Sequence, residues 1–178
     1  MPGEKLILKA NHSWKCKPGN SICVIDRGTV RFEYPSHWIV EPVDGALHLY
    51  DRPPSVESCD LGVSTFPVAR EAIRNLPLDD TLRASLESEW VPYHQSEIHH
   101  PENADSDIAW LEQQYVDTEH NRDARLRVAV ARGSVLCLIT MNYWSDRASV
   151  LEQVWDEVLR TMVFGVMIAD PTAGPVVQ

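Results

Sequence analysis

Long apolar runs are absent from this sequence of 178 residues. No run approaches the roughly 20 consecutive apolar residues that a helix needs to cross a bilayer. Residues 1–10 also lack a basic leader followed by an apolar core and a small-residue cleavage site. We therefore expect a cytoplasmic protein that does not engage a membrane.

Glycine-rich phosphate-binding motifs are absent as well. Neither the phosphate-cradling loop nor the dinucleotide fingerprint is present, which removes the easiest routes to nucleotide chemistry. Residues 62–66 resemble the nucleophile elbow of hydrolases, but Phe66 replaces the second glycine and no helix pattern follows. We interpret this segment as the interior of a strand.

Basic residues are few and scattered. Sixteen Lys and Arg stand against 26 Asp and Glu, which gives a formal net charge of −10. Such a chain repels phosphate backbones, so nucleic acid is not expected as a partner. The acidity favours a basic peptide or protein surface, or it serves solubility alone.

The four cysteines, Cys16, Cys23, Cys59 and Cys137, are dispersed and are expected to be reduced. A chain with 44% hydrophobic and 24% charged residues folds without disulfides at this length. We expect one domain over residues 29–168. An N-terminal extension or added hairpin precedes it in residues 1–28, and a flexible tail follows in residues 169–178.

A hairpin and a preceding strand are predicted in the first third of the chain. Val30, Phe32 and Tyr34 alternate with charged residues until Pro35 stops the strand. Two apolar runs then flank Asp44-Gly45, a pair suited to a tight hairpin turn. A strand that includes Pro42 is expected at a sheet edge, because proline lacks the amide that a central strand donates.

Four further strands and two helices follow in the pattern. The strands are expected at residues 59–66, 108–117, 124–131 and 135–143. Short links between the last three imply an antiparallel meander. The first helix carries Leu82, Leu86 and Trp90 on one stripe, with Asp79 or Asp80 as its cap. The second helix has an apolar face from Leu151 to Met162, with Ser145 or Asp146 as its cap.

Residues 34–38, the Asp44-Gly45 hairpin, the late meander and the helix containing residues 155–160 together resemble the PsbP-like superfamily, which includes the yeast Ran-binding Mog protein. The resemblance implies an α+β fold over about residues 29–166, in which a central antiparallel sheet is flanked by helices as an α/β/α sandwich. Its motifs are packing and turn signatures, so no functional residue is carried over. Members of this superfamily differ in task, and shared architecture does not establish shared activity.

The densest set of potential metal ligands is His94, Glu97, His99 and His100. Imidazole and carboxylate suit zinc or iron. The spacing does not match the helical zinc signatures, and Pro92 and Pro101 limit a helix here. The alternative is a polar loop or strand whose histidines meet solvent.

The other sets of potential ligands and reactive groups are weaker. His12, Cys16 and Cys23 surround a Pro-Gly turn but lack a fourth ligand and the usual cysteine spacing. Five carboxylates are potential acid and base groups, although solvated surface charge explains them better. They are Glu87, Glu89, Glu112, Asp117 and Glu119. Periodicity assigns Trp38 and Trp155 to packing. Tryptophans that would favour a protein-binding surface if exposed together are Trp14, Trp90, Trp110 and Trp144.

No residue set commits the chain to a reaction. We therefore expect a noncatalytic binding or accessory domain that engages a protein or peptide partner, with no cofactor. A small metal-dependent enzyme centred on residues 94–100 and a carrier with an apolar pocket under the last helix are the alternatives.

Overall fold

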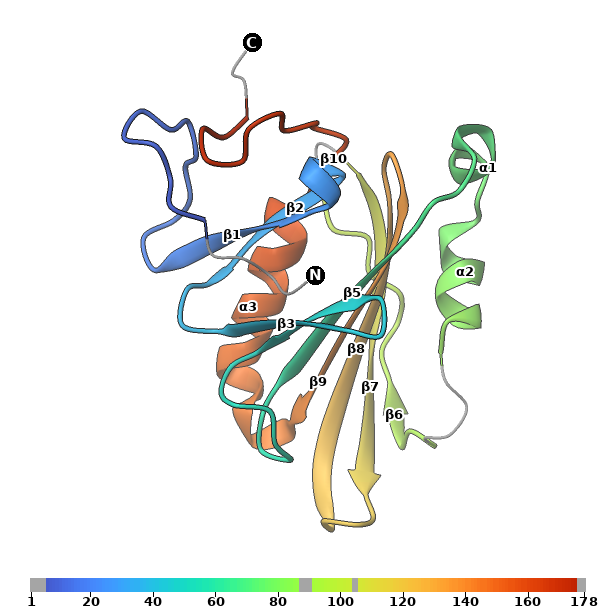
Figure 1. Cartoon of the computed structure of the whole chain (residues 1–178). Helices are drawn as coiled ribbons and strands as arrows, with labels where there is room; N and C mark the ends of the chain where they lie inside the picture. Colours follow the sequence, from blue (N-terminus) through green and yellow to red (C-terminus); the bar gives the residue numbers. More distant parts are fainter. Residues whose placement is uncertain (1–5, 87–90, 104–105, 176–178) are drawn as a thin grey trace.

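A seven-stranded antiparallel sheet lies between helices in the computed structural model, which describes residues 6–86, 91–103 and 106–175. Helix α2 packs on one face against β7 and β8, and helix α3 packs on the other face against β9 (Figure 1). A separate three-stranded sheet lies beyond α3, which contacts its middle strand β2. The predicted α+β class, with a central antiparallel sheet flanked by helices, is confirmed.

The large sheet has the strand order β3–β4–β5–β9–β8–β7–β6. Its strands are β3 Ile39–Val43, β4 Ala46–Tyr50, β5 Asp60–Phe66, β6 His94–Gln95, β7 Asp107–Asp117, β8 Arg122–Arg132 and β9 Leu136–Trp144. The small sheet contains β1 Asn20–Ile25, β2 Val30–Pro35 and β10 Val163–Phe164. The helices are α1 Arg70–Arg74, α2 Leu78–Ala84 and α3 Ala148–Thr161, with short 3-10 turns η1 at Asp26–Gly28 and η2 at Ser145–Arg147. No helix in these described parts is long and apolar enough to cross a membrane.

The predicted strands and hairpin form where the residue pattern placed them. In β2 the alternating Val30, Phe32 and Tyr34 are all buried, as a half-buried strand requires. Asp44 and Gly45 both adopt positive φ, 49° and 86°, which is the backbone that a two-residue hairpin turn demands. The hairpin strand β3, which contains Pro42, lies at the edge of the large sheet.

The long strands β7, β8 and β9 form the predicted meander and bury side chains on both faces. On the α2 face, Leu82 of the helix packs with Leu111 and Val128 of the sheet. On the α3 face, Ile139 and Met141 of β9 join the main core. A sheet covered on both sides needs apolar residues at successive positions, as β8 shows from Val128 to Ala131.

Helix α3 buries Leu151, Trp155, Val158 and Leu159, the apolar face that the spacing of three and four predicted. The predicted cap is wrong. Turn η2 leads directly into the helix, no side chain caps its first turn, and Asp146 instead pairs with Arg122 at 2.6 Å.

Helix α2 also differs from its prediction at both ends. Asp79 and Asp80 lie within its first turn, where they face the positive end of the helix, and neither caps it. The helix ends at Ala84, so Leu86 packs against the core from beyond the helix. Trp90 lies outside the described residues.

The N-terminal segment contributes one strand. The sequence left an added hairpin or an extension open for residues 1–28, and β1 pairs along β2 from Asn20 opposite Pro35 to Ile25 opposite Val30. Residues 6–10 form no strand. The hairpin therefore joins β1 to β2, with one strand on either side of residue 28.

Residues 169–175, expected as a flexible tail, lie along the N-terminal segment. The Lys9 amide donates to the Thr172 carbonyl at 2.9 Å, and the Ser13 amide donates to the Ala173 carbonyl at 2.7 Å. An ion pair joins Lys9 Nζ to Asp170 Oδ2 at 2.6 Å. The two ends of the described chain are thus held together (Figure 1).

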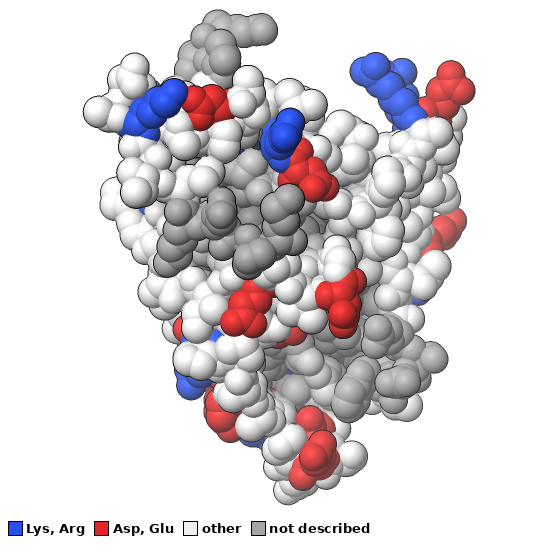
Figure 2. Space-filling model, viewed as in Figure 1, with Lys and Arg blue, Asp and Glu red and all other residues white. Residues whose placement is uncertain are grey.

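On the face of the molecule that Figure 2 shows, basic and acidic side chains are scattered, and the basic ones do not gather in one patch.

A charged network lies buried between the large sheet and α3. Glu112 is 8% exposed and Arg127 is 6% exposed, and Arg127 Nε donates to Glu112 Oε2 at 2.8 Å. Arg125 links Glu112 Oε1, at 3.2 Å, to Glu152 of α3, at 2.9 Å. Burial alone would raise the pKa of Glu112, but hydrogen bonds from Gln114 and Arg127 outweigh it and hold that pKa below its usual value.

Removing Arg127 should deprive the buried Glu112 carboxylate of its closer guanidinium partner and leave Arg125 alone to neutralise it. We expect Arg127→Leu to lower the free energy of unfolding by about 3 kcal/mol in urea denaturation at pH 7. Arg160→Leu, which removes an exposed partner of Glu157, serves as the control and should leave stability nearly unchanged. Equal effects of the two substitutions would contradict the assigned role of the network.

The same network should also affect how the free energy of unfolding falls at acidic pH. The pKa of Glu112 is lower in the folded protein than its unfolded value near 4.5. The ionised carboxylate therefore contributes fully to the free energy of unfolding above the unfolded pKa, and this contribution is lost as pH falls through the folded pKa. We expect Glu112→Gln to show a smaller stability loss between pH 5 and pH 3 than the unmodified protein, measured by urea denaturation across that range. A steeper loss in the variant would contradict the sign.

Candidate functional site

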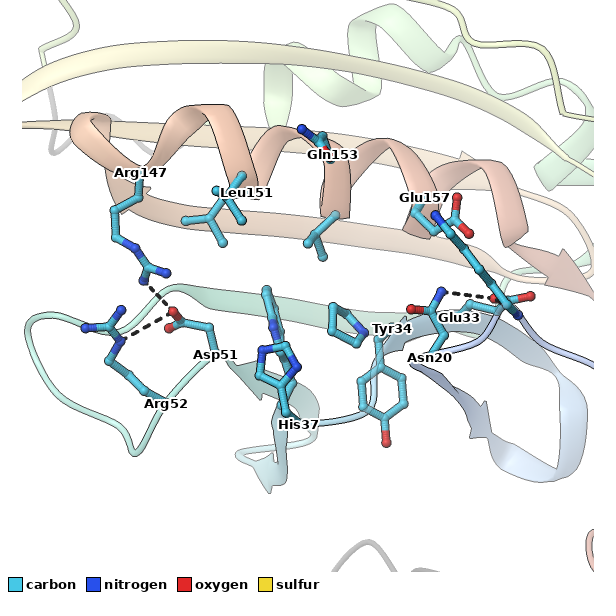
Figure 3. Close-up of a pocket in the computed structure, with 15 residues that line it drawn as sticks. Asn20, Glu33, Tyr34, His37, Asp51, Arg52, Arg147, Leu151, Gln153 and Glu157 are labelled. Atoms are coloured by element: carbon cyan, nitrogen blue, oxygen red, sulfur yellow. Dashed lines mark hydrogen bonds and ion pairs between the residues drawn. The ribbon is translucent and has the colours of Figure 1, made fainter.

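A cleft with a volume of about 480 Å³ runs along one side of α3. Its opposite wall is the corner between β2 and β3, together with the residues that follow β4 (Figure 3). The chain folds this way locally because Pro35 ends β2 and a turn follows, in which the Trp38 amide donates to the Pro35 carbonyl at 3.0 Å. That turn directs the chain into β3 beside the helix.

The middle of the cleft is apolar. Trp38 and Tyr34 line it from the β2–β3 corner and are 4% and 9% exposed, while Leu151 lies at the buried face of α3. Val150 and Val154 line the same side of the helix, and Val150 is 60% exposed. An apolar side chain so open to water, next to a buried aromatic floor, is the kind of surface that a partner covers.

One end of the cleft carries two guanidinium groups around one carboxylate. Asp51, whose side chain is 6% exposed, accepts hydrogen bonds from Arg147 and from Arg52, the latter at 3.4 Å (Figure 3). The same carboxylate accepts from the Cys59 amide at 2.7 Å, which fixes its position. Two cations on one anion leave this end with excess positive charge, and Arg52 is 45% exposed to solvent.

The other end is lined by two carboxylates. Glu33 Oε2 accepts from the Lys17 amide at 3.0 Å and from Asn20 Nδ2 at 3.1 Å. Glu157 lies nearby on α3, and its hydrogen bond from Arg160 holds the pKa of that carboxyl below its usual value. The charges of Lys17 and Arg160 balance those of the two carboxylates. The cleft is therefore apolar in the middle, with excess positive charge at one end and ion-paired carboxylates at the other.

The histidine cluster that the sequence singled out is dispersed over separate partners. His94 lies in β6 opposite Gln114, and Glu97 is exposed in the segment that follows. His99 stacks on Trp110 with ring centroids 4.4 Å apart, and His100 Nε2 lies 3.2 Å from Asp79 Oδ1. Among the described residues, no three His, Cys, Asp or Glu side chains gather as a metal ion would require.

The weaker candidate sets are not assembled either. Cys16 is exposed but Cys23 is buried, and burial raises the pKa of Cys23 to about 12, which disfavours a thiolate ligand. Residues 62–66 lie inside β5, which confirms the strand interpretation. Of the carboxylates, Glu112 belongs to the buried network, Asp117 contacts His120 and Glu119 is exposed. Glu87 and Glu89 lie outside the described residues.

The sequence assigned two tryptophans to packing and left the others open. Trp38 and Trp155 are buried, which confirms their packing role. Trp14 donates to the Pro171 carbonyl at 2.7 Å, Trp110 lies between His99 and Arg127, and Trp144 is buried at the end of β9. These three contact different elements and form no shared patch.

The cleft itself was missed at the level of sequence. Asp51 and Arg52 are adjacent, but Arg147 is 96 positions from Asp51 and meets it only because β4 ends beside the start of α3. One sequence signal was present. Val150 lies next to the buried stripe of α3 without belonging to it, and an apolar residue at such a position marks a surface that can be covered.

The reactivity of the four cysteines tests which of the candidate thiol ligands are buried. We expect a thiol reagent to modify one thiol rapidly in the native protein, Cys16, because Cys23, Cys59 and Cys137 are buried and burial raises the pKa of each. Cys16→Ser should abolish the rapid phase, and denaturant should expose all the remaining thiols. Rapid modification of Cys23 in the native protein would contradict this account.

Comparisons with known proteins place the fold and the family. A solved structure from Pseudomonas aeruginosa, PA94, described as a protein of unknown function and putative regulator, has a TM-score of 0.50 at 14% identity over 80% of this chain and 94% of its own. Cyanobacterial PsbP (CyanoP) from Synechocystis sp. PCC 6803 has a TM-score of 0.49 at 16% identity over 86% of this chain and 99% of its own. At these identities the likeness concerns the fold alone, and these relatives give no support to the Mog-like part of the resemblance.

The uncharacterized protein alr1449 from Nostoc sp. (strain PCC 7120) is 36% identical over 174 residues, which cover 96% of this chain and 91% of that protein. The family model described as Alr1449 matches residues 21–168, which include the cleft apart from Lys17 and Asn20. The chain therefore belongs to the Alr1449 family.

Proposed function

We propose that the protein is a noncatalytic binding module that takes an extended peptide segment of a partner protein in the cleft beside α3. The observation that carries the proposal is that the exposed Val150 and the buried Trp38 line the same cleft, one end of which has excess positive charge. An apolar side chain of the peptide would cover Val150 and displace water from it. We take the protein to act in the cytoplasm, as the sequence led us to expect.

The length of the cleft sets the length of the peptide. Arg147, at the end of η2, and Glu157, on α3, mark its ends, and ten residues at the helical rise span about 15 Å. An extended strand covers that distance with about four or five residues. The peptide would place an acidic group beside Arg52 and Arg147, because charge complementarity fixes its direction.

The catalytic alternative lacks a comparable arrangement. Acid and base groups act when they are aimed at a common reacting atom, whereas the charged groups of the cleft stand at its two ends and are held by neighbouring protein groups. Such groups recognise a ligand and orient it. The same geometry favours binding over chemistry.

Panning a displayed library of random peptides on the purified protein tests the proposal. Enriched peptides should carry an apolar residue near an acidic one, and fluorescence polarisation of the synthetic peptides should show saturable binding. We expect Val150→Glu to raise the dissociation constant at least about tenfold, because it places a charge against the apolar side chain of the peptide. Val116→Glu, the same change at an exposed position of β7 outside the cleft, should alter it less than about twofold.

Two outcomes would overturn the proposal. One is that no enriched peptide binds saturably. The other is that peptides bind the Val150→Glu and Val116→Glu variants equally well, which would place their site elsewhere. A small molecule that remains with the purified protein in native mass spectrometry and occupies the cleft would support the carrier alternative instead.

A further inference from the structure

A second cavity, with a volume of about 300 Å³, lies on the opposite face of the large sheet. It is formed at the ends of the strands that α2 leaves uncovered, since α2 packs near Val128 and Val130 and the cavity lies beside Ala124. The loop after β4 closes it from the side. Trp144 Nε1 donates to the Val56 carbonyl of this loop at 2.7 Å, which holds the loop against the sheet.

Two neighbouring rows of cross-strand partners build the walls of this cavity. In one row Tyr50 of β4 lies opposite Asp60 of β5, which lies opposite Asn142 of β9. In the next row Tyr115 of β7 lies opposite Ala124 of β8, which lies opposite Trp144 of β9. Ala124 is small, so a notch forms between two large aromatic side chains.

The cavity presents negative charge without a basic side chain. Asp60 and Asp117 line it, and no Lys, Arg or His is among the described residues that do so. Asp60 Oδ1 contacts His48 Nδ1 at 2.7 Å, yet the Asp60 side chain is 40% exposed. The His120 amide donates to Asp117 at 2.9 Å, and this bond is the main reason that the pKa of Asp117 is lowered.

The nearest arginine does not neutralise the cavity. Arg122 lies over the ring of Trp144, 4.7 Å from its centroid. Its guanidinium is already paired with Glu57 at 2.9 Å and with Asp146 at 2.6 Å, and neither of these carboxylates is among the residues that line the cavity. Two carboxylates therefore compensate this one cation.

We propose that this cavity binds a small organic cation, an alkylammonium or a guanidinium compound. Carboxylate oxygens accept charge-assisted hydrogen bonds from such a group, and the aromatic residues Tyr50 and Tyr115, to which a cation is attracted, line the same cavity. The volume is at the lower end of the range for small-molecule sites, so the ligand is a compact amine. The site is separate from the cleft beside α3 and does not depend on its role.

Titration calorimetry with agmatine as the probe tests this site, with 1,4-butanediol as the uncharged counterpart. We expect saturable binding of agmatine and none of the diol. Asp60→Asn should weaken agmatine binding about tenfold, because it removes the partly exposed charge that the cation meets. Asp44→Asn removes a carboxylate at the tip of the β3–β4 hairpin, where asparagine tolerates the positive φ, and should change the affinity less than twofold.

A second variant tests the site by shape. Ala124→Val fills the notch between Tyr115 and Trp144 without changing charge, and it should also weaken binding if it retains a cooperative unfolding transition. Absence of saturable agmatine binding to the unmodified protein would overturn the proposal. Equal losses in Asp60→Asn and Asp44→Asn would also overturn it, since they would reduce the effect to the overall acidity of the protein.

Discussion

Helix α3 is the element on which the rest of the structure depends, because it packs against both sheets. Trp155 is fully buried and meets Trp110 of the large sheet edge-on, with ring centroids 5.8 Å apart. On its other side the helix contacts β2 of the small sheet, and Thr161 Oγ1 accepts from the Glu33 amide at 2.9 Å. Without this helix the two sheets would share little packing, and the small sheet would lose its core.

The same packing creates the cleft. A helix that touches two diverging sheets fills the space between them only where its buried stripe reaches, so a groove remains beside the stripe. Trp38 lies in the apolar middle of that cleft, and Asp51 fixes Arg147 and Arg52 at one end. The apolar middle and charged ends are therefore consequences of how α3 is held, and a ligand there would contact both structural layers.

Local pattern was sufficient to predict most of the fold. Alternation gave β2, a two-residue turn gave the β3–β4 hairpin, and the stripe of Leu151, Trp155 and Leu159 gave α3, because each signal acts between near neighbours. Helix caps failed because η2 and Pro77 provide the starts of α3 and α2 by backbone geometry. The pairing of β1 with β2 and the hydrogen bond between Ser13 and Ala173 were not predicted. Each segment could pair with several others in the chain, and a sequence pattern does not say which pairing is the most stable.

The candidate sites were less predictable for the same reason. Glu112 was singled out, but its pairing with Arg127 follows from the register of β7 on β8, and Asp51 meets Arg147 across 96 positions of the chain. Histidines close together in sequence diverged, because successive side chains of an extended segment point to opposite sides. Contacts between residues that are distant in sequence depend on the strand order and register of the sheets, which local sequence patterns do not give.

The central claim, that the groove beside α3 binds peptide, is tested most directly by NMR chemical-shift mapping with a selected peptide. The account predicts that amide signals of Val150, Gln153, Val154 and His37 move together as peptide is added, while those of β6 and α2 stay in place. Shifts confined to β6, α2 or the cavity beside Ala124, with the α3 groove unchanged, would contradict it.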